Sequence, residues 1–93
     1  MTEIAKSIRV TGRVQGVGFR WMTKRVADQL KIRGFVLNRV DGSVYIEACG
    51  DVVAMAKFAA AIKASPTPSG RVATYEDHLL TKDFPNNEFI VTF

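Results

Sequence analysis

The spacing of the apolar residues constrains this chain most, because it switches repeatedly between the two-residue period of a strand and the longer period of a helix. Apolar and polar residues alternate across residues 8–14, as in a strand with one buried face. A helical stripe follows and ends near Lys31, before Gly34; it is formed by Met22, Val26, Ala27 and Leu30. The chain therefore begins with a strand, a glycine-rich loop and a helix.

The rest of the chain repeats this alternation in a different order. Two strands, 33–39 and 44–49, flank Asp41-Gly42, a strong signal for a hairpin turn. Asp51 is suited to cap a second helix, whose apolar stripe is Val52, Met55, Ala59 and Ile62. Residues 65–70 contain two prolines and a glycine and must form a loop. Strands follow at 72–80 and 89–93.

This order predicts an α+β fold. It matches a ferredoxin-like βαββαβ sandwich with an additional strand, in which two helices cover one face of a mainly antiparallel sheet. Residues 1–93 are expected to form a single domain, since a chain of this length has room for one core.

Composition is that of a soluble globular protein, with 47% hydrophobic and 24% charged residues. No apolar stretch approaches the roughly 20 residues that span a bilayer, and the N-terminus lacks the apolar segment of a signal peptide. We therefore expect a cytoplasmic protein without a membrane partner. The single cysteine, Cys49, cannot form an internal disulfide and is interpreted as a small buried hydrophobic residue.

The positive charge is concentrated in the first half of the chain. Residues 1–40 contain nine Lys or Arg against two acidic residues, whereas residues 41–93 contain four against seven. An anionic ligand would therefore be attracted to the first half, although such a distribution is also typical of a solvated surface without a ligand.

A glycine-rich run, residues 12–20 (Gly-Arg-Val-Gln-Gly-Val-Gly-Phe-Arg), joins the first strand to the first helix. Its glycines allow successive amides to turn inward as an anion-binding nest, and the helix N-terminus points to the same place. Arg20 adds a planar group that can bind phosphate in bidentate fashion. The run is neither a Walker loop, which needs Lys where Phe19 stands, nor a dinucleotide fingerprint, which needs Gly where Trp21 stands.

A second run, residues 34–44, contains Asn38 and the predicted hairpin turn. In a right-handed βαβ unit the first two strands run in the same direction, so their ends lie at one edge of the sheet. Asn38 is therefore expected near the glycine-rich loop. It is either a turn residue bonded to its own backbone or a neutral amide that positions a water or a substrate oxygen.

Together the two runs, G-R-V-Q-G-V-G-F-R at 12–20 and G-F-V-x-N-x-x-D-G-x-V at 34–44, resemble the acylphosphatase family across nearly the whole chain. The resemblance implies hydrolysis of the carboxyl–phosphate bond of small acyl phosphates, without a metal or other cofactor. It implies that Arg20 and Asn38 are the catalytic residues. The amide loop and the basic first half of the chain also predict that inorganic phosphate or sulfate binds at residues 15–20 and inhibits. The phosphate-binding residues would be Gln15, Gly16, Val17, Gly18, Phe19 and Arg20.

The sequence departs from the family pattern at Leu37, where a cation is common, and within residues 64–72. Neither departure affects Arg20 or Asn38. Phe19 and Trp21 are expected to support the core or the loop, with the shaping of an acyl pocket as the alternative. His78 and the neighbouring carboxylates Glu76 and Asp77 are expected to be non-catalytic.

The alternative function is a non-catalytic anion- or RNA-binding module of the same fold. Arg33-Gly34-Phe35 resembles the start of an RNP1 motif, but the residues that follow do not continue it, and the first strand lacks stacking aromatics. We therefore expect an acyl phosphate hydrolase that acts as a monomer without a nucleic-acid partner.

Overall fold

A computed structural model describes residues 2–93 and contains five strands and two helices. In chain order these are β1 (Glu3–Arg13), α1 (Phe19–Gln29), β2 (Arg33–Asn38), β3 (Val44–Asp51), α2 (Val52–Lys63), β4 (Arg71–Leu80) and β5 (Phe89–Thr92). The order confirms the predicted β-α-β-β-α-β succession with one further strand. β1 begins earlier than the apolar alternation at residues 8–14 because it pairs with a strand on each side.

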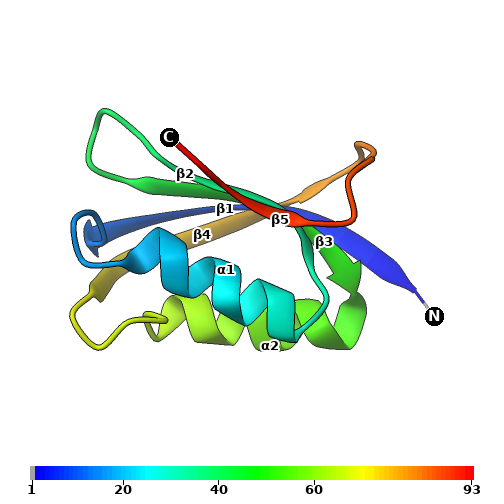
Figure 1. Ribbon diagram of the computed structural model, residues 1–93, viewed down its shortest axis with the longest axis horizontal. Coiled ribbons are helices and arrows are strands. Elements are labelled where there is room, and N and C mark those ends of the chain that lie inside the picture. The colour runs from blue at the N-terminus through cyan, green and yellow to red at the C-terminus, as the bar shows by residue number, and fades with distance from the viewer. Residues whose placement is uncertain (1) are drawn as a thin grey trace.

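The strands form one sheet in the order β4-β1-β3-β2-β5. β1 runs antiparallel to β3 and β4, and β2 runs antiparallel to β3, whereas β2 and β5 are parallel. Both helices lie on the same face of this sheet (Figure 1). The predicted fold class, a ferredoxin-like sandwich with an additional strand, is confirmed.

The core lies between the sheet and the two helices. The sheet contributes the fully buried Ile8, Val10, Val36, Val44 and Ile46. The helices contribute Phe19, Ala27, Met55, Phe58 and Ile62. The chain thus buries branched residues from strands against larger side chains from helices, as expected for two packed layers.

The predicted apolar stripes need correction in both helices. In α1 the expected Ala27 is buried and Val26 and Leu30 pack against the core, so the stripe is confirmed in part, but the fully buried face also includes Phe19 and Thr23. Val52 is exposed because it is the first residue of α2, although Asp51 caps this helix as predicted by accepting bonds from the amides of Val53 and Ala54. Neither α1 nor α2, the helices of the described residues, is long and apolar enough to cross a bilayer.

The sheet brings three loops together at one end. β1 and β2 run in the same direction because β3 lies between them and is antiparallel to both, and Val44 is paired with Val10 on one side and with Asn38 on the other. The loop 14–18, the hairpin 39–43 and the loop 64–70 therefore emerge at the same end of the molecule (Figure 1). This is the edge where the sequence placed the glycine-rich loop and Asn38.

Candidate active site

The glycine-rich loop has the backbone geometry of an anion-binding nest. Gly16 and Gly18 have φ of 73° and 79°, in the left-handed region that glycine adopts without strain, and Val17 between them lies outside that region. Gly18 also caps α1. Within residues 2–93, the backbone amides of residues 15–20 donate no hydrogen bond to another backbone group. A row of unpaired amides at a helix N-terminus is well suited to an anion.

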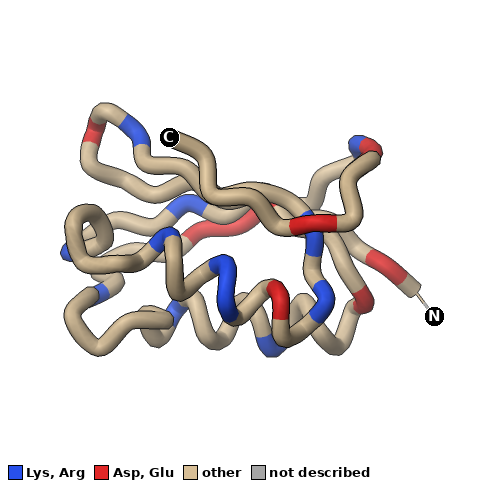
Figure 2. The backbone as a smooth tube through the Cα atoms, in the orientation of Figure 1, with Lys and Arg blue, Asp and Glu red and all other residues tan. Residues whose placement is uncertain are grey.

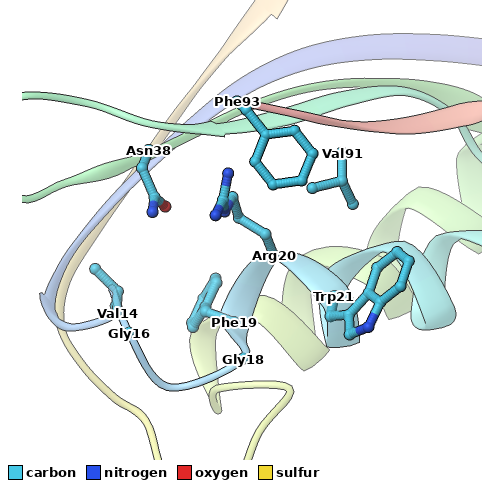
Figure 3. A pocket seen from close by; sticks show the side chains of 9 residues that line it. All are labelled: Val14, Gly16, Gly18, Phe19, Arg20, Trp21, Asn38, Val91 and Phe93. Atoms are coloured by element: carbon cyan, nitrogen blue, oxygen red, sulfur yellow. The ribbon is translucent and has the colours of Figure 1, made fainter.

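A cavity of about 280 Å³ opens above this loop (Figure 3). Its lining combines loop, helix and strand residues: Val14, Gly16, Gly18, Phe19, Arg20, Trp21, Asn38, Val91 and Phe93. Both predicted catalytic residues line it, as do four of the predicted phosphate-binding residues; Gln15 and Val17 do not. The structure thus brings Arg20 and Asn38 together from positions 18 residues apart in the chain.

Arg20 projects from the first turn of α1 toward β5. One guanidinium nitrogen, Nη1, donates a 2.9 Å hydrogen bond to the carbonyl oxygen of Thr92, and the guanidinium carbon lies 4.7 Å from the centre of the Phe93 ring. Within the described chain, Arg20 forms no ion pair with a carboxylate. Its position is therefore fixed by contacts that leave its charge available to an anion.

No acidic side chain lies next to Arg20 in the sequence or lines the cavity. Residues 14–27 include no Asp or Glu, and Figure 2 shows only basic and neutral residues along the loop and the first turns of α1. Several other cations of the first half are paired with carboxylates, among them Arg33 with Glu3, Arg9 with Asp41 and Glu76, and Lys24 with Asp28. The cavity end at Arg20 therefore has a positive potential that favours an anionic ligand.

Asn38 is the last residue of β2 and faces the cavity from the side of the hairpin (Figure 3). Its Oδ1 is buried and has no hydrogen-bond partner within the described residues. Buried polar atoms are normally paired, so an unpaired one calls for an explanation, such as a water or a ligand atom. This geometry contradicts the interpretation of Asn38 as a turn residue whose Oδ1 bonds its own backbone.

The side chain of Gln15 connects the glycine-rich loop to the hairpin. Its Nε2 donates to the carbonyl oxygens of Arg39 and Ser43, at 2.8 Å in each case. The Asp41 carboxylate accepts bonds from the amide and hydroxyl of Ser43 and pairs with Arg9. These contacts with Ser43, followed by the Arg9 guanidinium, hold the pKa of Asp41 well below its usual range. Asn38 is therefore fixed relative to the loop by the residues that follow it.

The loop 64–70 supports the glycine-rich loop on the side away from the cavity (Figure 3). Thr67 is 6% exposed, and its hydroxyl donates a 3.1 Å hydrogen bond to the carbonyl oxygen of Val17. The same hydroxyl accepts from the amide of Ser69. A side chain at Gly70 would collide with the Ser65 hydroxyl and Thr67, so the loop 64–70 is itself tightly packed. Sequence reasoning did not find Thr67, because nothing local marks a contact that spans 50 residues.

The remaining candidates lie elsewhere. Cys49 is buried on β3, and burial raises the pKa of its thiol, as expected for an inert residue. Glu76 pairs with Arg9, and Asp77 pairs with Lys6. Among residues 2–93, no three His, Cys, Asp or Glu side chains are grouped as a metal site would require.

The aromatic neighbours of Arg20 differ in their environments. Phe19 is fully buried in the core, as expected. Trp21, by contrast, is 67% exposed and lines the cavity mouth, so of its expected roles the one in the core is excluded. Its exposure follows from its place on the side of α1 opposite to the buried Phe19, Thr23 and Ala27.

Comparisons with known proteins agree with this geometry. The acylphosphatase family model matches residues 6–91. An acylphosphatase of Lacticaseibacillus paracasei is 55% identical over 92% of this chain and 91% of its own. One from Latilactobacillus sakei is 60% identical over 73% of this chain and 74% of its own. The crystal structure of acylphosphatase from Bacillus subtilis superimposes with a TM-score of 0.91 at 34% identity, covering 97% of this chain and 99% of that one.

Proposed function

Because the chain belongs to the acylphosphatase family and hydrolyses acyl phosphates, we propose that Arg20 and the amides of the glycine-rich loop hold the phosphate and that Asn38 positions the attacking water. The observation that carries this assignment is the cavity itself. It is bounded by the glycine-rich loop, by the Arg20 guanidinium and by the unpaired Oδ1 of Asn38.

The phosphate would lie at the loop end of the cavity. The unpaired amides of residues 15–20 can each donate to a phosphate oxygen, with Gly16, Gly18, Phe19 and Arg20 nearest the cavity. The guanidinium of Arg20 retains donors beyond the one that bonds Thr92, so it can bind two phosphate oxygens while Thr92 and Phe93 keep it in place.

Asn38 contributes through its carboxamide oxygen. Oδ1 can only accept a hydrogen bond, so it would accept one from the water and direct a lone pair of the water oxygen toward phosphorus. A new bond then forms between the water oxygen and phosphorus as the bond from phosphorus to the carboxyl oxygen breaks. The bonding electrons leave with the carboxylate.

The proton balance requires no general base from the protein. The second proton of the water passes to an oxygen of the phosphate, so that the products are a carboxylate and dihydrogen phosphate. An acyl phosphate has a good leaving group, and the protein contributes mainly positioning and charge stabilisation.

We also propose that residues 1–93 act as one domain, as a cytoplasmic monomer without a nucleic-acid or membrane partner. In support, Arg20, Asn38 and the glycine-rich loop already line one cavity within this chain, so the proposed chemistry needs no residue from a second copy. A turnover rate per chain that stays constant on dilution, together with a monomer mass in sedimentation, is the expected result. Loss of specific activity on dilution would contradict it.

The assignment is tested by separating binding from chemistry. Inorganic phosphate should inhibit benzoyl phosphate hydrolysis competitively. Arg20→Gln should lose both phosphate affinity and turnover, and Arg20→Lys should be nearly as poor, because an ammonium cannot bind two oxygens in the same plane. Asn38→Ala should keep phosphate affinity while kcat falls by about 10²–10³.

Two outcomes would contradict these roles. A folded Asn38→Ala variant with a kcat near wild type would show that its Oδ1 does not position the water. A loss of phosphate affinity in step with kcat would instead assign Asn38 to phosphate binding.

A further inference from the structure

The cavity extends beyond the atoms needed for phosphate and water. Its far wall is apolar and is formed by Trp21, Val91 and Phe93. Trp21 is 67% exposed and Phe93 is 99% exposed, so both present large apolar surfaces to a ligand entering the cavity. No role in holding phosphate or water requires these surfaces.

The position of this wall relative to Asn38 is the informative feature. Figure 3 shows Asn38 on one side of Arg20 and Trp21 on the opposite side, with Val91 above Trp21 and Phe93 above Arg20. The two flanks of the guanidinium therefore differ in character. One presents a buried carboxamide oxygen, and the other presents hydrocarbon and aromatic surface.

Phosphoryl transfer places the attacking and leaving oxygens roughly in line on opposite sides of phosphorus. If the water lies on the Asn38 side, the carboxyl oxygen that leaves must point to the other side, toward Trp21 and Val91. The acyl group is attached to that oxygen. Its substituent would therefore lie against the apolar wall.

We propose that Trp21, Val91 and Phe93 form an acyl subsite, so that the preferred substrates are acyl phosphates with an aromatic or extended apolar acyl group. This inference rests on the proposed placement of phosphate at Arg20 and of water at Asn38. An aromatic acyl group packs against the indole in an offset or edge arrangement, whereas the methyl group of acetyl phosphate is too small to cover it.

The charge around this wall suits the product. None of the side chains that line the cavity is acidic, so the carboxylate that forms during the reaction meets no like-charged side chain there. Lys24 and Arg25 flank the other side of Trp21 in a neighbouring groove, which also contains Asp28, the partner of Lys24. The subsite therefore offers apolar contact to the acyl group and places no acidic side chain where the product carboxylate leaves.

The experiment compares two substrates and two stable analogues on Trp21→Ala. The substrates are benzoyl phosphate and acetyl phosphate; the analogues, in which CH2 replaces the bridging oxygen, are phenacylphosphonate and acetonylphosphonate. In Trp21→Ala, KM for benzoyl phosphate should rise about tenfold, as expected when roughly 50 Å² of apolar surface is no longer buried. KM for acetyl phosphate and the inhibition constant of inorganic phosphate should stay within about twofold of wild type.

Two control variants accompany it. Trp21→Phe should recover most of the preference for benzoyl phosphate, because it restores an aromatic face. Leu79→Ala removes another exposed apolar side chain, 72% exposed on β4 and outside the cavity, and should change neither substrate.

A second readout does not depend on turnover. Trp21 is the only tryptophan, so its fluorescence reports directly on the subsite. Phenacylphosphonate should change the emission of the wild-type protein at saturation, whereas acetonylphosphonate and inorganic phosphate should change it little.

The outcomes separate this inference from the proposed function. If wild type binds phenacylphosphonate no better than acetonylphosphonate, or Trp21→Ala leaves the ratio of kcat/KM for the two substrates unchanged, the acyl subsite is wrong. Competitive inhibition by phosphate would still support the loop assignment. If a folded Trp21→Ala loses phosphate affinity as well, Trp21 serves the phosphate end and the subsite is likewise wrong. If inorganic phosphate does not compete with the substrate in wild type, the proposed placement of phosphate is wrong, and the acyl subsite that rests on it is wrong as well.

Discussion

The hydroxyl of Thr67 controls the direction of one peptide group in the phosphate loop. In a trans peptide the carbonyl and the amide of the next residue point in opposite directions. The carbonyl of Val17 points to Thr67, behind the loop, so the amide of Gly18 points to the other side, where the cavity lies. Thr67→Val removes the hydroxyl and keeps the shape of the side chain.

The expected magnitude follows from the bonds lost. The 3.1 Å bond to Val17 contributes about 1 kcal/mol net, and the amide of Ser69 loses its acceptor as well, so the variant should be about 1–2 kcal/mol less stable. A bond from an amide to a charged phosphate is worth about 1.5–3 kcal/mol. For Thr67→Val we expect a loss of about 1.5 kcal/mol, which corresponds to an inhibition constant of phosphate about ten times higher. The loss is at the lower end because the Val17–Gly18 peptide, no longer held by Thr67, can still turn its amide toward the ligand.

The assay is a phosphate titration monitored by amide NMR, together with the inhibition constant. In wild type, the Gly18 amide should shift strongly with phosphate, along with that of Gly16. In Thr67→Val the Gly18 shift should shrink more than the Gly16 shift, and Thr67→Ser should restore it. Thr23→Val is the matched control, since the Thr23 hydroxyl is buried without a partner within the described chain and its loss should leave phosphate binding unchanged.

Either of two results would refute this reasoning. One is a wild-type Gly18 amide whose NMR shift does not change with phosphate while the shifts of neighbouring amides do. This result would refute the reasoning even if Thr67→Val fails to fold. The other is a folded Thr67→Val whose phosphate affinity and Gly18 shift equal those of wild type. In both cases Thr67 would only stabilise the loop 64–70.

Three further predictions follow. Gln15→Ala loses both bonds to the hairpin and should lower kcat about tenfold. Gln15→Glu cannot donate these bonds either, so its kcat should be no higher. A Gln15→Glu variant with wild-type kcat would show that these two bonds do not position Asn38. The pKa of Asp41 is lowered in the folded state, so its ionised form stabilises the fold above the unfolded pKa of about 3.9, and this contribution is lost as pH falls through the lower folded pKa. Asp41→Asn should therefore make the unfolding midpoint less dependent on pH in acid. An unfolding midpoint whose pH dependence is the same in Asp41→Asn and wild type would count against this role of Asp41. Turnover should survive EDTA, and Cys49→Ala and His78→Ala should retain most activity; a metal-restored loss, or inactivity of either folded variant, would require another mechanism.

The sequence could predict those parts of the site that depend on local signals and on strand direction. Glycine at positions 16 and 18 permits the positive φ that both residues adopt, and the turn at Asp41-Gly42 follows from turn chemistry. The meeting of Arg20 and Asn38 then follows from the parallel direction of β1 and β2, which the handedness of the βαβ unit imposes. Each of these steps uses residues within one element or one connection.

What could not be predicted depends on packing between distant segments. The pairing of β5 beside β2 brings Val91 and Phe93 to the cavity, and no local pattern specifies that edge. The bond from Thr67 to Val17 depends on how two irregular loops fit together.

The loop amides and Asn38 must hold their geometry without help from a regular element, and the structure explains how they do so. A loop with two left-handed glycines is intrinsically mobile, and Asn38 lies at the end of its strand. Gln15 fixes the loop to the hairpin on one side, and Thr67 fixes it to the loop 64–70 on the other. All three bonds end on backbone carbonyl oxygens, so they restrain the chain without occupying the amides that an anion needs. The predicted losses for Gln15 and Thr67 should therefore be distinguishable, the first mainly in kcat through Asn38 and the second mainly in phosphate affinity through Gly18.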